Sequence, residues 1–476
     1  MRAALLRIVV TTPRRALTRG SPVCLSDSSI SRDSGITLPA PPPSLHQANN
    51  HVTMPLHVFT TGSGKDKGSS SISSSSSNSN SSSIASPSTL MTPSHRGLAT
   101  SAAAPGEAVL LKDEYGNMDA SGQTYVVPHF TTESGVAMRD VEVRYNTFGH
   151  LNEAKDNVLV VCHALTGNAR LDTWWSSILG PGKAFDTDKY LVVCANILGS
   201  CYGTTGPTSL DPATGRPYGV RFPQVTIRDT VALHIRMLKE ALGARSVACV
   251  VGGSLGGMQA LEWVFLGNSN KNHSSNNNEN EENFVRSAVV IACGARHTAW
   301  QIGISETQRQ AIYADPLWRG GEFDHTRPPL QGLAVARQIA MFSYRTPHGF
   351  ENKFGRAQAE DGRFEVRRYL EYQGQKFLSR FDALTYVRLT EKMDSHDVGR
   401  GRGGMEVALK GLRVPVLVLG IDSDVLYPLH EQEEMARLIP KGELRVVRSR
   451  EGHDGFLLEQ EQVGGAMKEF LKEHRL

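Results

Sequence analysis

The sequence has few cysteines, and none of them takes part in a metal-binding or disulfide pattern. Its six cysteines form no Cys-x-x-Cys pair and no cluster with histidines at metal-ligand spacing, which disfavours a zinc-dependent mechanism. Four of them, at positions 162, 194, 249 and 293, lie within or next to apolar strand-like runs. This placement is typical of cysteines that act as small core residues in a protein of a reducing compartment. We therefore expect no metal site.

Long apolar runs and an excess of one charge are also missing. No stretch approaches the roughly 20 apolar residues that a membrane-spanning helix needs, so we expect a soluble protein without a membrane partner. The formal net charge is +3, and five arginines precede the first acid, Asp27. Because this excess belongs to the N-terminal segment, it does not indicate a nucleic-acid surface, and we expect no nucleic-acid partner.

Residues 1–100 resemble a leader rather than a folded domain. Their first part is rich in Arg and Ser and poor in acids, and it has no uninterrupted apolar core of the kind a secretory signal requires. Residues 69–83 are almost entirely Ser and Asn, which predicts disorder. We expect a mitochondrial transit peptide and a mitochondrial protein; the alternative is a disordered tail on a cytoplasmic protein.

The rest of the chain alternates buried strand-like runs with helical patterns, which predicts an α/β fold with a mostly parallel sheet. We expect a first part of the core at 105–294 and a second part at 405–476. Residues 295–404 have helical patterns without an obvious strand and predict an inserted helical lid that shapes a pocket. The Asn-rich and Ser-rich stretch 268–283 is interpreted as a surface insertion.

A serine surrounded by glycines is the strongest catalytic signal. Ser254 lies in the run Gly-Gly-Ser-Leu-Gly-Gly, which follows the apolar run 247–251 and precedes a helical pattern. A strand, a sharp turn and a helix at such a serine are typical of a nucleophile elbow, which exposes the hydroxyl above a sheet. Gly-rich turns that cradle phosphates or only close a loop are the alternative, and the strand and helix context favours the elbow.

A serine nucleophile needs a base and an orienting carboxylate, expected in the chain order Ser, Asp, His. Asp422 and Asp424 come just after the apolar run 414–420, and His453 follows a short strand-like run at 444–447. Because active groups gather at the C-terminal ends of parallel strands, all of these residues should reach one edge of the sheet. From spacing alone, either aspartate could be the acid.

At these residues the chain resembles the homoserine O-acetyltransferase-like acyltransferases of the α/β-hydrolase fold, from about residue 126 to the C-terminus. The motifs that carry the resemblance are His163-Ala-Leu-Thr-Gly167, Asn196-Ile-Leu-Gly-Ser-Cys-Tyr-Gly203, Gly253-Ser-Leu-Gly-Gly-Met-Gln259, Ser423-Asp-Val-Leu-Tyr-Pro428 and Gly452-His-Asp454.

The resemblance implies a role for each site residue. Ser254 is the implied nucleophile, with Asp424 as the acid and His453 as the base, and the backbone N–H groups of Leu165 and Leu255 are the implied oxyanion hole. The implied acceptor site has four residues: Arg337 for the substrate carboxylate, Asp454 for its ammonium, and Tyr344 and Thr166 in the pocket wall.

The resemblance therefore implies an acyltransferase without a bound cofactor. It would move the acetyl group of acetyl-CoA, as co-substrate, to the side-chain hydroxyl of L-serine or L-homoserine. Analogy with mitochondrial members of the family favours serine. Succinyl-CoA as donor, a carboxylesterase with the same triad, and a catalytically inactive scaffold are the alternatives. The expected partners are the small-molecule amino acid and the acyl-CoA, and we expect a homodimer.

Overall fold

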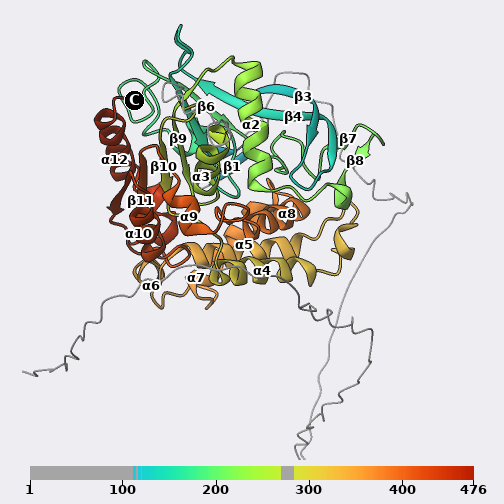
Figure 1. Ribbon diagram of the computed structural model, residues 1–476. Coiled ribbons are helices and arrows are strands. Elements are labelled where there is room, and N and C mark those ends of the chain that lie inside the picture. The colour runs from blue at the N-terminus through green and yellow to red at the C-terminus, as the bar shows by residue number, and fades with distance from the viewer. Residues whose placement is uncertain (1–110, 114–115, 119–120, 270–282) are drawn as a thin grey trace, which may run out of the picture. The chain divides into compact units, whose positions relative to one another are not determined.

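The computed structural model describes residues 111–113, 116–118, 121–269 and 283–476 (Figure 1). The predicted leader at 1–100 and all but the two ends of the predicted insertion at 268–283 lie outside the described residues. The two predicted parts of the core and the predicted lid are described almost completely.

A sheet of eight strands forms the centre of the described chain (Figure 1). Six neighbouring strands are parallel, and two antiparallel strands extend one edge. The order across the sheet is β12 (Gly442–Val447), β11 (Val416–Ile421), β10 (Ala288–Ile291), β9 (Val247–Gly253), β5 (Val158–Cys162), β6 (Leu191–Ala195), β4 (Ala137–Phe148) and β3 (Gln123–Thr131). This topology confirms the predicted α/β-hydrolase fold with its mostly parallel sheet.

The composition of the central strands explains their position. Every residue of β5, β6, β9, β10 and β11 is buried. Parallel strands covered by helices on both faces need such continuous apolar runs, whereas a half-exposed strand alternates. The apolar residues at 285–291 predict a strand, but the observed strand is shorter: Val285 makes only an isolated bridge to Val247, and the ladder begins at Ala288.

Helices pack against the sheet, and the start of one of them is fixed by a capping motif. Helix α2 (Ile227–Ala241) begins with a capping box, in which the Thr226 hydroxyl accepts the Asp229 N–H and the Asp229 carboxylate accepts the Thr226 N–H. The helices outside the predicted lid are α1 (Leu171–Trp174), α2 (Ile227–Ala241), α3 (Leu255–Gly267), α9 (Met405–Lys410), α10 (Leu429–Leu438), α11 (Gly455–Leu458) and α12 (Gln460–Glu473), with the 3-10 turns η1 (Gly219–Arg221) and η4 (Gly452–Asp454).

The span 295–404 folds as a group of helices that gather beside the sheet (Figure 1). Within it, α5 (Leu330–Tyr344) packs against both α4 (Ala299–Tyr313) and α7 (Glu365–Leu378), and α4 also packs against α8 (Ala383–Asp394). Its described residues form no strand ladder and only two isolated bridges. Its elements are α4 (Ala299–Tyr313), η3 (Arg319–Gly321), α5 (Leu330–Tyr344), α6 (Pro347–Phe354), α7 (Glu365–Leu378) and α8 (Ala383–Asp394).

Two small antiparallel pairs were not predicted. They are β1 (Leu111–Asp113) with β2 (Gly116–Met118), and β7 (Leu210–Asp211) with β8 (Arg216–Pro217).

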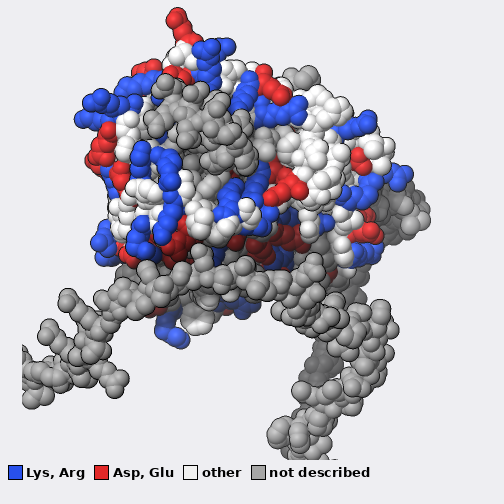
Figure 2. Space-filling view, in the orientation of Figure 1, with Lys and Arg blue, Asp and Glu red and all other residues white. Residues whose placement is uncertain are grey.

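On the face shown in Figure 2, basic and acidic side chains are interspersed. None of the helices in the described ranges combines the length and the apolar character needed to cross a bilayer.

Candidate active site

The turn between β9 and α3 holds Ser254 in a conformation that few non-glycine residues adopt. Its backbone has φ 57° and ψ −126°, which lies outside the regions favoured by L-residues. The Ser254 N–H donates to the Ile291 carbonyl at 2.9 Å, and the Ser254 carbonyl accepts the Gly257 N–H at 2.8 Å. These bonds to β10 and α3 hold the strained turn in place.

The glycines of this turn are required by close backbone approach. A Cβ on Gly252 would lie 2.1 Å from the Gly256 carbonyl oxygen, and one on Gly256 would lie 2.1 Å from the Cys162 carbonyl oxygen. Both distances are far below any normal contact, so a side chain at either position would force the turn apart. The sharp turn predicted between the strand and the helix at Ser254 is therefore present.

The structure brings Asp424 and His453 into direct contact. The Asp424 Oδ2 lies 2.7 Å from the His453 Nδ1. The other oxygen of Asp424 accepts the N–H groups of Leu426 at 2.8 Å and Tyr427 at 2.9 Å. The His453 side chain is 3% exposed and that of Asp424 is fully buried. A carboxylate fixed in this way orients the imidazole and leaves Nε2 for proton transfer.

Asp422 lies in a different environment, although it is only two residues away. Its carboxylate accepts the Ser449 N–H at 3.0 Å and pairs with the Arg448 guanidinium at 3.2 Å. Neither contact involves His453. Of the two aspartates that spacing left open, the geometry therefore favours Asp424 as the partner of the histidine.

Three aromatic rings surround the imidazole of His453. The ring centroids of Tyr427, Phe456 and Tyr344 lie 5.2, 5.4 and 5.6 Å from the imidazole centroid. Tyr344 comes from α5 of the helical span, whereas Tyr427 and Phe456 come from the second part of the core. Both parts of the chain therefore fix the plane of the ring and shield it from water.

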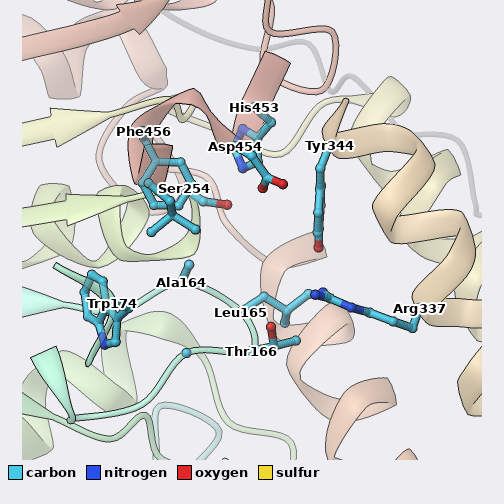
Figure 3. Close-up of a pocket in the computed structure, with 12 residues that line it drawn as sticks. Ala164, Leu165, Thr166, Trp174, Ser254, Arg337, Tyr344, His453, Asp454 and Phe456 are labelled. Carbon is cyan, nitrogen blue, oxygen red and sulfur yellow. The ribbon is translucent and has the colours of Figure 1, made fainter. Parts of the chain in front are cut away.

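A pocket opens between Ser254 and the helical span (Figure 3). It joins apolar side chains from the core to a small number of polar and charged groups, as small-molecule sites do. The lining residues are Ala164, Leu165, Thr166, Gly167, Trp174, Ser254, Arg337, Tyr344, His453, Asp454, Phe456 and Leu457.

The four residues expected to bind an acceptor all line this pocket. Arg337 and Tyr344 point into it from α5, whereas Thr166 follows β5 and Asp454 follows His453 (Figure 3). Arg337 is 2% exposed, and its guanidinium carbon lies 5.0 Å from the centroid of the Phe377 ring, within the range of a cation–π contact.

Burial moves the pKa of the pocket tyrosine further above the physiological range. Desolvation raises the pKa of Tyr344 to about 12, although the positive charge of Arg337 opposes the shift. The phenol is therefore neutral at physiological pH and can donate a hydrogen bond into the pocket.

Of the two backbone positions expected to form an oxyanion hole, one lines the pocket together with Ser254 and the other follows Ser254 in the chain. Leu165 lines the pocket just beyond the C-terminal end of β5, and Leu255 is the first residue of α3. The first N–H groups of a helix have no acceptor within the helix, so the Leu255 N–H can donate to a developing negative charge.

Two arginines near the pocket were missed from the sequence. Arg380, which is 6% exposed, donates from Nη1 to the Thr166 carbonyl at 2.9 Å and to the Tyr202 hydroxyl at 2.8 Å. The Arg345 Nε lies 3.0 Å from the Asp454 Oδ2. Asp454, expected to pair with a substrate ammonium, thus also pairs with a guanidinium of the protein. Neither arginine lies in a motif that marks it.

Metal ligands do not gather in the part of the chain that the structure describes. No group of three or more His, Cys, Asp or Glu side chains there could hold a metal ion. The chemistry of the pocket is instead that of a serine hydroxyl, an imidazole and a few fixed charges.

Comparison with known proteins identifies close relatives of this chain. A family described as "alpha/beta hydrolase fold" matches residues 157–460. The chain is 47% identical over 346 residues to a homoserine O-acetyltransferase of Chlorobium chlorochromatii, covering 72% of this chain and 92% of the relative. It is 49% identical over 340 residues to a homoserine O-acetyltransferase of Salinibacter ruber, covering 71% and 94%.

Solved structures include hydrolases of the same architecture. Esterase E22 aligns with a TM-score of 0.66 at 26% identity, covering 73% of this chain and 99% of the esterase. The shared architecture is therefore compatible with transfer of an acyl group either to a second substrate or to water.

Proposed function

Because the chain belongs to the homoserine O-acetyltransferase family of the α/β-hydrolase fold and is an acyltransferase, we propose that it transfers acetyl from acetyl-CoA to the hydroxyl of L-homoserine. The observation that carries the proposal is the placement of Arg337 and Asp454 in the same pocket as Ser254 and His453. A guanidinium and a carboxylate suit the two charged ends of a free amino acid.

In the proposed first half-reaction, the serine is acylated. His453 removes the proton of the Ser254 hydroxyl, whose oxygen attacks the thioester carbonyl carbon. The N–H groups of Leu165 and Leu255 stabilise the tetrahedral oxyanion. The carbon–sulfur bond then breaks, and the coenzyme A sulfur leaves with the proton held by His453. Asp424 keeps the imidazole in the required tautomer and stabilises its charged form.

In the proposed second half-reaction, the acceptor replaces coenzyme A. Arg337 binds its carboxylate and Asp454 its ammonium, while Thr166 and the neutral Tyr344 complete the wall. His453 removes the proton of the acceptor hydroxyl, which attacks the acyl-enzyme carbonyl. Breaking the ester bond returns the proton to the Ser254 oxygen and releases the O-acetyl amino acid.

Ester hydrolysis is the second candidate, favoured by the likeness to esterase E22. Water would take the place of the acceptor in the second half-reaction, and the same triad would serve. The two candidates differ in the use of Arg337: a hydrolase of simple esters has no carboxylate for this guanidinium to bind. Substantial hydrolysis that is independent of amino acid and of Arg337 would favour the esterase.

Initial rates with each pairing of L-homoserine or L-serine with acetyl-CoA or succinyl-CoA test the proposal. We expect the highest kcat/KM with L-homoserine and acetyl-CoA, since the relatives compared above are homoserine O-acetyltransferases. Higher values with L-serine would restore the acceptor favoured by the mitochondrial analogy. A higher value with succinyl-CoA, or no dependence on an amino acid, would contradict the proposal.

Mitochondrial import and a homodimer stay predictions. Fusing residues 1–100 to a reporter protein would test import, because a transit peptide should carry the reporter into mitochondria and a cytoplasmic tail should not. Light scattering of the purified protein would measure its mass in solution and so test the dimer.

A further inference from the structure

Arg345 joins the end of a lid helix to the loop that carries His453. It is the residue that follows the last turn of α5, and its guanidinium lies against two carboxylates of that loop. Its Nε is 3.0 Å from the Asp454 Oδ2, and its Nη1 pairs with the Glu451 Oε2 at 2.5 Å. None of the roles considered above involves this arginine.

Of the two ion pairs that Arg345 makes, the one with Asp454 is the more important because it is buried. The Asp454 side chain is only 3% exposed, whereas that of Glu451 is 41% exposed. A carboxylate at such depth is costly to keep charged unless a cation lies close to it. The Arg345 side chain, itself 14% exposed, supplies that cation and holds the carboxylate at the pocket wall.

Further contacts join the end of α5 to the loop. The Thr346 hydroxyl donates to the Arg450 carbonyl at 2.7 Å and accepts the Gly349 N–H at 2.8 Å. Gly452 has φ +66°, and a Cβ there would lie 2.8 Å from the Tyr344 carbonyl oxygen. The end of α5 and the loop therefore touch backbone to backbone.

This junction fixes the two ends of the acceptor site relative to each other. Arg337 and Tyr344 project from α5, and Asp454 projects from the loop that α5 contacts. The spacing between the guanidinium and the carboxylate of the site depends on how α5 meets the loop. Arg345 lies where α5 meets the loop and contacts the Asp454 carboxylate directly.

We propose that Arg345 is a positioning residue for the acceptor amino acid, acting by holding the Asp454 carboxylate oriented toward the ammonium group. The inference rests on the proposed function, because it requires Asp454 to bind that ammonium. The donor thioester makes no use of Asp454, so the role is confined to the second half-reaction.

Steady-state and burst kinetics of Arg345→Gln and Arg345→Lys test this role with acetyl-CoA as donor and L-homoserine as acceptor. Arg345→Gln should raise the acceptor KM about tenfold or more, with a smaller change in kcat. The burst of coenzyme A released without acceptor should keep its wild-type rate and amplitude. Arg345→Lys should recover part of the acceptor KM, because it restores the charge without the planar geometry.

Arg448→Gln is the matched control. Arg448 belongs to the same loop region, but it pairs with Asp422 and its side chain is 77% exposed. The acceptor KM of Arg448→Gln should stay within about twofold of that of the wild type, since exposed ion pairs contribute little. An equal rise in Arg448→Gln and Arg345→Gln would assign the effect to general loop charge and overturn the inference.

A double-mutant cycle separates a positioning role from a structural one. If Arg345 acts through Asp454, adding Arg345→Gln to Asp454→Asn should lower kcat/KM for the acceptor by less than about twofold, whereas independent effects multiply. Multiplying losses, an unchanged KM in Arg345→Gln, or an equal fall in the burst would overturn the inference. Should Arg345→Gln not fold, Arg345→Lys carries the same cycle.

The outcomes also separate this inference from the proposed function. A wild-type enzyme without acceptor-dependent turnover would end both. A wild-type enzyme that uses L-homoserine, together with an Arg345→Gln variant of the same acceptor KM, would end only the role of Arg345.

Discussion

Replacing Arg337 by Lys should impair the use of the acceptor and spare the acylation of the enzyme. The change keeps a positive charge in a position that is 2% exposed, but it removes the planar fork that binds both carboxylate oxygens. It also removes the guanidinium that lies 5.0 Å from the Phe377 ring centroid. Loss of one charged hydrogen bond together with the ring contact corresponds to about 2–3 kcal/mol, or about 30–150-fold in kcat/KM for the amino acid.

The two half-reactions provide the assay for this variant. Coenzyme A release in a burst without acceptor should match the wild type, because the thioester has no carboxylate for Arg337. The control is Val335→Ala, a change two residues away on α5 at a position that is 45% exposed, which should leave both half-reactions unchanged. Equal losses in both half-reactions of Arg337→Lys would mean that Arg337 supports the fold or the donor site, and would refute its role in acceptor binding.

Three further predictions concern the triad and the buried histidines. Ser254→Ala should reduce turnover by about 10³-fold or more with an unchanged thermal melting curve; near wild-type turnover would remove the nucleophile. Asp424→Asn should reduce kcat by about 10³-fold, and Asp422→Asn by less than about tenfold; the reverse order would reassign the acid. Burial lowers the pKa of His163 and of His234 to about 4, so between pH 6.5 and 4 the unfolded chain binds more protons than the folded one. In urea titrations across this range, these two histidines together should lower the free energy of unfolding by about 3 kcal/mol for each pH unit of acidification. If the dependence of the free energy of unfolding on pH were the same in His234→Asn as in the wild type, that would contradict this contribution.

Local sequence was sufficient to predict the strand, turn and helix of the elbow and the α/β class of the fold. The glycines around Ser254 are required by backbone contacts within a few residues and with the adjacent β5, and β5 itself is a continuous apolar run of five buried residues. Strand ends were less accurate, because the start of β10 depends on pairing with β9 and β11 and not on its own apolar residues.

The side chains that support the pocket could not be predicted in the same way. Arg380 contacts the carbonyl of Thr166, a residue 214 positions earlier, and Arg345 contacts Glu451 at a separation of 106 positions. An isolated arginine on a helical pattern has the same local signature whether it is solvated or buried against a distant loop. Only the packing of the helical span on the core distinguishes these two cases.

The most direct test of the central claim is to follow the acetyl group on Ser254. Wild-type protein is mixed with acetyl-CoA, and one sample is quenched at once. A parallel sample receives L-homoserine before it is quenched, and both samples are mapped by peptide mass spectrometry. The account predicts an acetyl group on the peptide containing Ser254, which disappears on addition of L-homoserine much faster than in water alone, with formation of O-acetylhomoserine. Acetylation elsewhere or not at all, or loss of the acetyl group at the same rate with and without the amino acid, would contradict acyl transfer through this serine.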